Sequence, residues 1–133
     1  MRHVITVDTT ENYEIVDLTE RVAGLVTSGD GVCFLFLPHT TAALTLASLE
    51  DEAPGDLKAA PQQIVPRIDW RHLPAEHTPG HVLSAIIGAT LTIPVQDGRL
   101  ALGEFQRLVL LEFQGPATRQ INIEFWNRTG EGA

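Results

Sequence analysis

The sequence predicts an α+β domain of about seven mostly antiparallel strands with two or three helices. Short runs of apolar and β-branched residues, separated by turn residues, make up most of the chain. A few segments instead repeat apolar residues at the spacing of a helix face. The 133 residues are 44% hydrophobic, which suits one core, so we expect a single domain over residues 1–133.

The N-terminal part predicts two strands and a helix. The segments HVITVDT (3–9) and YEIVDLT (13–19) alternate apolar and polar residues, and we expect them to form a hairpin that turns near residues 10–12. Thr19 then precedes an apolar face at helical spacing. We therefore expect Thr19 to be the N-cap of a helix over residues 20–29.

The next segments predict a central strand with a break after it. GVCFLFL (31–37) is too continuously apolar to be half exposed, so it predicts a strand buried on both faces. AALTLAS (42–48) is expected to be its partner, or its continuation beyond Pro38. Residues 49–66 are acidic and then bounded by prolines, which predicts only a short, broken helix.

The second half predicts a loop, a helix and an antiparallel meander. Prolines and a glycine make residues 69–80 a loop, and HVLSAIIG (81–88) has helical spacing with Gly88 as its stop. Four β-rich runs follow, separated by turn signals. Strands this apolar are expected to need covering by other subunits. The expected strands are 90–95, 99–102, 105–113 and 119–126, with turns at 96–98 and 114–116.

Charge and composition exclude several classes of partner. The formal net charge is −8, and binding to nucleic acid or to an anionic membrane needs a basic face. No run approaches the roughly 18 apolar residues of a membrane span, and the N-terminus lacks the pattern of a signal peptide. We therefore expect a cytoplasmic protein, in which the single Cys33 fills the core.

Four histidines lie at predicted loops or element ends, where side chains can converge on a rigid scaffold. Three imidazoles are the protein ligands of a catalytic zinc site, which leaves a fourth position for water or substrate. No two of His39, His72 and His81 have the i, i+4 spacing of a local metal motif. Structural roles for His39 and a solvated position for His77 therefore stay open, whereas His72 and His81 flank the proline-rich loop.

Two threonines and an arginine are candidates for binding an anion. Thr40 and Thr41 offer hydroxyl and backbone groups beside His39, and local turn-making is the alternative role for both. Arg119 follows a Gly-Pro turn and would supply the positive charge that an anion needs. An ordinary ion pair of Arg119 with Glu112 or Glu124 is an equal alternative.

An acidic cluster follows the His39 segment. Glu50 or Asp51, which lie beside Glu52 and Asp56, could act as a general base or as a fourth metal ligand. Such clusters on short helices are more often simply solvated. The chain contains no phosphate-binding P-loop, dinucleotide fingerprint or Gly-x-Ser-x-Gly elbow, which disfavours nucleotide hydrolysis and serine-hydrolase chemistry.

Four parts of the sequence carry a recognisable family pattern: HTTAALTL (39–46), His72, GHVLSAIIGATLTIPVQDGRLALGEFQ (80–106) and LLEFQGPATRQINI (110–123). With them, nearly the whole chain resembles the YjbQ-like family, UPF0047, which is also labelled secondary thiamine-phosphate synthase. This resemblance implies an α+β domain with a β-sandwich that assembles into a homotrimer through its sheets. It also implies a divalent metal site, typically zinc, held by His39, His72 and His81 near a subunit boundary.

The resemblance also implies a substrate and an activity. Five positions match family residues that bind a small anionic or phosphorylated substrate. The implied activity is a weak joining of a pyrimidine pyrophosphate to a thiazole phosphate, which gives thiamine phosphate. The matching positions are Thr40, Thr41, Gly103, Gln106 and Arg119.

The chain departs from the family pattern at two places. Residues 47–49 are Ala-Ser-Leu where relatives carry Asn-Glu-Asn, so Ser48 stands where the family has a glutamate. Glu50 or Asp51 would replace that carboxylate only after a shift of the backbone, because neighbouring strand residues point to opposite faces. The loop before His81 is also shorter than in relatives. A non-catalytic trimer that binds a metal and an anion is therefore the alternative function.

Overall fold

In the computed structural model, residues 2–64 and 78–128 form eight antiparallel strands in two sheets and three helices. This confirms the predicted α+β class. The elements are β1 (Arg2–Asp8), β2 (Ile15–Asp17), α1 (Thr19–Ala23), β3 (Gly31–Phe36), β4 (Ala42–Ala47), α2 (Ala53–Ile64), α3 (Thr78–Ile87), β5 (Thr90–Gln96), β6 (Arg99–Leu100), β7 (Arg107–Glu112) and β8 (Thr118–Asn127).

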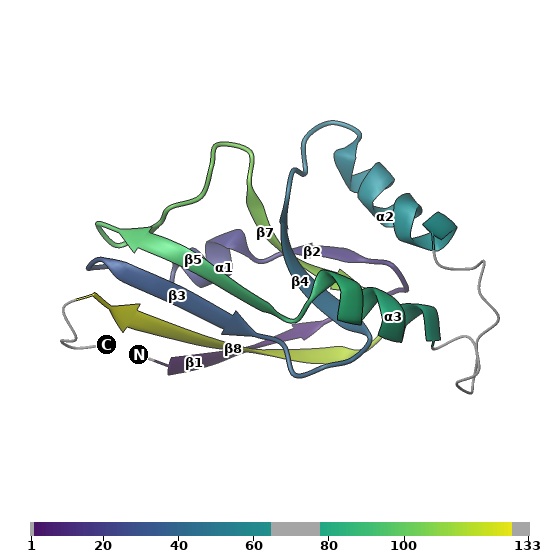
Figure 1. Ribbon diagram of the computed structural model, residues 1–133, viewed down its shortest axis with the longest axis horizontal. Helices are drawn as coiled ribbons and strands as arrows, with labels where there is room; N and C mark the ends of the chain where they lie inside the picture. The colour runs from purple at the N-terminus through teal and green to yellow at the C-terminus, as the bar shows by residue number, and fades with distance from the viewer. Residues whose placement is uncertain (1, 65–77, 129–133) are drawn as a thin grey trace.

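The two sheets stack face to face, and helices cover the second sheet (Figure 1). The larger sheet has the order β1-β8-β3-β5-β6 and the smaller has the order β2-β7-β4. One core fills the space between the sheets. A second, smaller core lies between the three-stranded sheet and α3, where Leu83 packs with Ala43 and Phe113.

Strand β7 shows how the sequence produces these layers. Leu108 and Leu110 point into the core between the sheets, whereas Val109 and Leu111 belong to the core under the helices. Because successive strand residues point to opposite faces, a strand that is covered on both sides must be apolar at every position. Glu112 ends this apolar run and is nevertheless fully buried.

The predicted hairpin between the first two strands is wrong. β1 pairs with β8 over seven residues, from Arg2 opposite Glu124 to Asp8 opposite Thr118. β2 instead pairs with β7 in the other sheet, with Val16 opposite Leu110. The two segments do alternate as predicted, but the long ladder that β8 offers takes β1 away from its neighbour in sequence.

Thr19 is not the N-cap of α1, and this prediction is also wrong. Leu18 holds the N-cap position, and the Thr19 hydroxyl oxygen instead accepts a hydrogen bond of 2.8 Å from the backbone N–H of Leu108. The Asp17 carboxylate accepts the Thr19 N–H at 3.0 Å and so replaces the missing cap. The helix is correspondingly short and ends well before Gly29.

Three predictions for the residues after 31 are wrong: the partner of the strand after Pro38, the broken helix before residue 66, and the order of the last four strands. The strand after Pro38, β4, is neither partner nor continuation of β3, because it crosses to the other sheet and pairs with β7. Residues 53–64 form one helix, α2, with Pro61 inside it. The last four strands do not form a meander, because β7 lies in the smaller sheet and β8 returns between β1 and β3 (Figure 1).

The glycine signals of the second half are confirmed. Asp97 and Gly98 both have positive φ, which allows the tight β5–β6 turn, and Gly88 ends α3 with a φ of 111°. The Gly88 carbonyl then accepts a hydrogen bond from Leu44 N–H, so the end of α3 is tied to β4. Among the described residues, no helix is long and apolar enough to cross a membrane.

Candidate functional site

The loop between β3 and β4 carries His39 and leaves the larger sheet at Pro38. Leu37 N–H donates to the Ala89 carbonyl at 2.8 Å, which fixes the point of departure. The half-buried His39 ring then turns back toward β8, where its Nε2 accepts a hydrogen bond of 3.0 Å from the Gln120 backbone N–H. The structure therefore gives His39 a defined partner and a fixed position beside the start of β8.

Thr41 joins this loop to both sheets. Its carbonyl accepts a hydrogen bond of 3.1 Å from Phe113 N–H, just beyond β7. The Nη2 group of Arg119, which lies in β8, donates to the Thr41 hydroxyl oxygen at 2.9 Å and to its carbonyl at 3.3 Å. Thr40 is exposed next to it. Phe113 and Arg119 thus fix Thr41 from the smaller and the larger sheet respectively.

A buried ion pair lies beneath the loop. Arg119 donates to the Glu112 carboxylate through Nε at 2.8 Å and also through Nη2, and the Glu112 side chain is completely buried. Two more donors reach the same carboxylate, the Thr9 hydroxyl at 2.8 Å and the Gln114 N–H at 3.0 Å. Of the alternatives for Arg119, the ion pair with Glu112 is therefore present.

The surroundings set the charge of both titratable groups. Burial raises the pKa of Glu112. The hydrogen bonds from Arg119, Gln114 and Thr9, together with the charge of Arg119, lower it by more than burial raises it, so the pKa lies below its ordinary value. Burial and the charge of Arg119 lower the pKa of His39 against the opposing Glu112 carboxylate. At pH 7 we therefore assign a carboxylate to Glu112 and a neutral ring to His39.

The first turn of α3 lies against the same loop. A Cβ atom at Gly80 would be 3.6 Å from the Thr41 Cβ and 3.3 Å from the Phe113 Cβ, so a residue without a side chain lets the helix approach closely. His81 follows directly in this turn. The fold therefore brings the His81 segment next to the His39 segment, although His39 and His81 are 42 positions apart in the sequence.

The remaining predicted site residues gather elsewhere. Gly103 N–H donates to the Gln106 side-chain oxygen at 2.8 Å, so these two residues close a turn whose tip exposes Phe105. Glu50 lies across from this turn in an open groove of about 360 Å³. Asp51 follows Glu50 in the turn before α2 and is exposed.

The two groups of residues lie at opposite ends of the smaller sheet. The β4–β7 register pairs Ala42 with Glu112 at one end and Ala47 with Arg107 at the other. Five residue steps along a strand span roughly 17 Å. Within one chain, the structure therefore brings together His39, Thr41, Arg119 and the His81 segment, but it does not bring the turn of Gly103 and Gln106 to them.

Imidazole nitrogens, a ligand type that zinc accepts, are present at this corner in His39 and in His81 of the first turn of α3. Within the described ranges, no three His, Cys, Asp or Glu side chains are grouped to hold a metal, while His72 and His77 lie outside those ranges. Ligation by His39 Nε2 would require it to leave Gln120 N–H, a net loss of about 1 kcal/mol.

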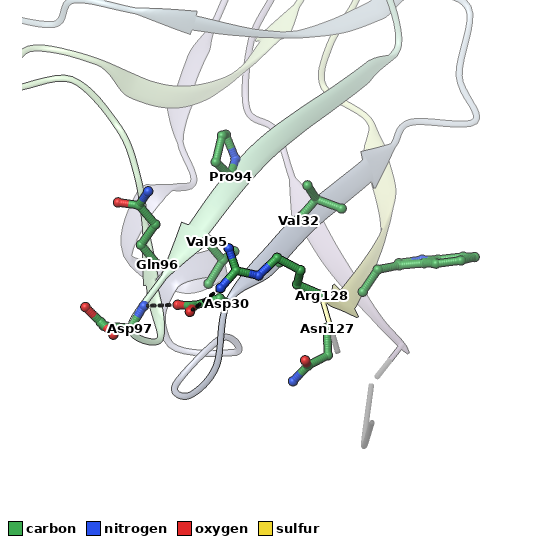
Figure 2. Close-up of a pocket in the computed structure, with 10 residues that line it drawn as sticks. Asp30, Val32, Pro94, Val95, Gln96, Asp97, Asn127 and Arg128 are labelled. Carbon is green, nitrogen blue, oxygen red and sulfur yellow. Dashed lines mark hydrogen bonds and ion pairs between the residues drawn. The ribbon is translucent and has the colours of Figure 1, made fainter. Parts of the chain in front are cut away.

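A separate groove of about 560 Å³ lies at the far end of the larger sheet, where β3 begins and β5 and β8 end. Figure 2 shows Arg128 reaching toward the Asp30 carboxylate, which also accepts the Asp97 N–H at 2.7 Å. The Trp126 indole, which is 62% exposed, borders the groove. No residue that the sequence marked as a site residue lines it.

Two groups that shape the site are not predicted from the sequence as site residues. Glu112 is predicted only as one possible ion-pair partner of Arg119, and the backbone N–H of Gln120 is not predicted at all. A signal for Glu112 existed, because a carboxylate ends a run of four apolar residues in a strand and an arginine follows a Gly-Pro turn. The Gln120 contact depends on where β3 leaves β8, which local pattern does not encode.

The fold and this corner define a class of protein. It is a two-sheet α+β domain in which a histidine-threonine loop, the start of a helix and a buried Glu-Arg pair meet at one sheet end. The family model for UPF0047 protein YjbQ-like matches residues 3–128. The chain belongs to the YjbQ-like UPF0047 family.

Individual relatives agree with this assignment. A UPF0047 protein of Archaeoglobus fulgidus is 33% identical over 90% of this chain and 97% of its own length. The UPF0047 protein YugU of Bacillus subtilis is also 33% identical, over 93% of this chain and 98% of its own. A YbjQ-like crystal structure from Sulfolobus solfataricus superimposes with a TM-score of 0.88 at 28% identity, covering 94% of this chain and 95% of that one.

Proposed function

We propose that the chain is a cytoplasmic, metal-dependent enzyme that acts on a small phosphorylated metabolite at the His39–Thr41 loop. The observation that carries this proposal is the meeting of that loop with the first turn of α3 beside Arg119. We assign a divalent ion, zinc, to His39, His72 and His81. When bound, the ion would polarise a phosphoryl oxygen or activate a water molecule. The proposed reaction is of the thiamine-phosphate-synthase type, in which the thiazole nitrogen forms a bond to the pyrimidine methylene carbon as the C–O bond to pyrophosphate breaks and pyrophosphate leaves.

The chain's own residues divide the remaining work. The exposed Thr40 is the candidate for direct hydrogen bonding to a phosphate oxygen, and the Thr41 hydroxyl, whose oxygen accepts from Arg119, retains its O–H as a second donor. Arg119 adds its positive charge from below the loop, although Glu112 offsets much of that charge. We therefore propose that Arg119 assists anion binding mainly by fixing Thr41.

Replacing His81 by alanine is expected to abolish metal retention. Loss of one imidazole leaves a two-histidine site, which is too few protein ligands for a catalytic zinc centre. Metal content per chain is measured by elemental analysis after zinc loading and desalting. His3→Ala is the matched control, because His3 is exposed at the start of β1. Equal zinc content in His81→Ala and the unmodified protein would refute the ligand assignment.

The alternative function is a non-catalytic protein that binds the metal and the anion. Ser48 favours this alternative, because the resemblance leads us to expect a carboxylate there and a hydroxyl, which accepts the Glu50 N–H at 3.3 Å, cannot act as a general base in its place. Incubating the zinc-loaded protein with a pyrimidine pyrophosphate and a thiazole phosphate separates the two. The enzyme is expected to release thiamine phosphate, whereas a binder gains thermal stability with these ligands and shows no turnover.

We further propose that the chain assembles into a homotrimer through the outer face of its larger sheet. Four apolar side chains on this outer face are exposed, whereas the inner face of the same sheet packs in the core. In a ring of three, one end of a subunit meets the opposite end of the next. A neighbour's Gly103–Gln106 turn, with Glu50 or Asp51 as its catalytic carboxylate, would then complete the site. The exposed side chains are Val4, Val32, Phe36 and Trp126.

The assembly predicts a mass of three 14.5 kDa chains in solution. Trp126→Glu places a charge in the proposed interface and is expected to shift the protein toward monomers in analytical ultracentrifugation. Ile86→Glu is the control, because Ile86 is 73% exposed on α3, away from that sheet face. A monomeric unmodified protein, or a trimer that tolerates Trp126→Glu as well as Ile86→Glu, would contradict the proposed interface.

A further inference from the structure

The contact between His39 and Gln120 occupies the place of a missing rung of the β3–β8 ladder. The last pair of this ladder is Phe36 opposite Asn122. The same register would place Pro38 opposite Gln120, but the chain has left the sheet there. Alternate residues of an antiparallel strand direct their N–H groups to the same neighbour, so Gln120 N–H points toward the side that β3 has vacated.

The His39 ring supplies the acceptor that the backbone no longer provides. Its Nε2 lies 3.0 Å from Gln120 N and accepts the hydrogen bond. A neutral imidazole that accepts at Nε2 carries its proton on Nδ1. In this arrangement neither ring nitrogen has a lone pair left for a metal ion.

We propose that His39 is an exchangeable cap of β8, which holds the Gln120 N–H in the metal-free protein and releases it when a metal ion binds. The metal half of this inference rests on the proposed zinc site. The capped state follows from the geometry alone. Because Nε2 cannot serve both groups, metal binding and the Gln120 hydrogen bond exclude each other.

The exchange is expected to stay local. Arg119, the residue before Gln120, holds Thr41 through two hydrogen bonds and is itself held by the buried Glu112 carboxylate. Gln120 also remains in the β1–β8 ladder opposite Thr6. Release of His39 therefore frees one amide, while the loop and the strand keep their other contacts.

Two NMR measurements on chelator-treated protein and zinc-loaded protein test the cap. Long-range proton–nitrogen spectra of the histidine rings report which nitrogen of His39 is protonated. Amide exchange reports the Gln120 hydrogen bond. In the metal-free protein we expect the proton on Nδ1 and a protected Gln120 amide. With zinc we expect Gln120 exchange to rise about fivefold, the factor that corresponds to a net hydrogen bond of about 1 kcal/mol, while the amide of Asn122 keeps its rate.

Two variants separate the acceptor from the metal ligand. His39→Gln retains a side-chain oxygen that can accept the Gln120 N–H. The backbone amide of Gln120 is therefore expected to stay protected in this variant with and without zinc. His39→Ala removes the acceptor, and the amide is expected to exchange rapidly in both conditions. These two variants bracket the unmodified protein in its two states.

The outcomes distinguish this inference from the proposed function. A metal-free His39 with its proton on Nε2 overturns the cap. Zinc binding with an unchanged Gln120 exchange rate overturns the exchange and leaves the metal site standing. If the unmodified protein retains no zinc, the proposed site fails and the exchange fails with it, while the metal-free spectra still decide whether His39 caps β8.

Discussion

Arg119→Met is expected to lower the free energy of unfolding by about 3–5 kcal/mol. The substitution keeps the length of the side chain but leaves the Glu112 carboxylate fully buried without its opposite charge. Two neutral donors, Thr9 and Gln114, do not replace the guanidinium. Urea denaturation at pH 7, followed by circular dichroism, measures the loss.

Arg107→Met is the matched control for this prediction. Arg107 forms an equally well-built pair with Asp17 and Glu20, but its side chain is 34% exposed. Exposed ion pairs contribute about 0–1 kcal/mol, so the same substitution is expected to have little effect here. Equal losses in the two variants would show that burial of the Glu112–Arg119 pair is not what makes it costly to break.

The pH dependence of the two proteins should have opposite signs. In the unmodified protein the pKa of Glu112 is lowered on folding, so its contribution is complete above the ordinary value of 4.5 and is lost as the pH falls through the folded value. In Arg119→Met, burial without the guanidinium raises this pKa instead. The variant's deficit relative to the unmodified protein should therefore shrink between pH 7 and pH 4.

Gly31→Ala is expected to destabilise the protein by about 3 kcal/mol, at the upper end of overpacking penalties. A methyl group on Gly31 would overlap the carbonyl oxygen of Trp126 in β8, which is backbone and cannot rotate away. The strands β3 and β8 would have to separate at the point where Gly31 pairs with Asn127. Thermal unfolding and urea denaturation both report this change.

Gly55→Ala tests whether the Gly31 effect comes from space or from glycine itself. Gly55 lies in α2, and a Cβ there would meet nothing within 4 Å. In a helix, alanine is favoured over glycine by about 1 kcal/mol, so this variant is expected to be slightly more stable. A Gly31→Ala protein as stable as Gly55→Ala would show that β3 and β8 can accommodate the methyl group.

Local signals in the sequence were sufficient for individual elements. The apolar run 31–37 predicted a central strand, which β3 is, but the prediction that it is buried on both faces is wrong, because Val32 and Phe36 are exposed on the outer face of the sheet. The Asp97-Gly98 pair predicted the hairpin turn that the structure has, and Gly88 predicted the end of α3. In these turns the physical cause lies within a few residues, a positive φ that glycine accepts.

Long-range pairing was beyond the reach of such signals. Two alternating segments joined by a short polar stretch look like a hairpin, yet β1 pairs with β8, which lies more than 100 residues away in sequence. Whether β1 pairs with β2 or with β8 depends on which of the two ladders is longer and on which face of the strand each ladder buries. Thr19 similarly has the residue type of a helix cap, but its hydroxyl oxygen instead accepts a hydrogen bond from the backbone N–H of Leu108 in β7.

The candidate site was predicted by residue type and only partly by arrangement. His39, Thr41 and Arg119 do lie together, and the His81 segment packs beside them. The distance along β4 that separates Gln106 from this group was not foreseeable from the sequence, because it follows from the β4–β7 register.

The most direct test of the account is a crystal structure of the zinc-loaded protein with anomalous diffraction recorded at the zinc absorption edge. We predict a peak at the His39 corner, with imidazole nitrogens of His39, His72 and His81 about 2 Å from the ion and with Gln120 N–H no longer bonded to His39. A corner without an anomalous peak, in which His39 still accepts the Gln120 N–H, would contradict the metal site and the function built on it.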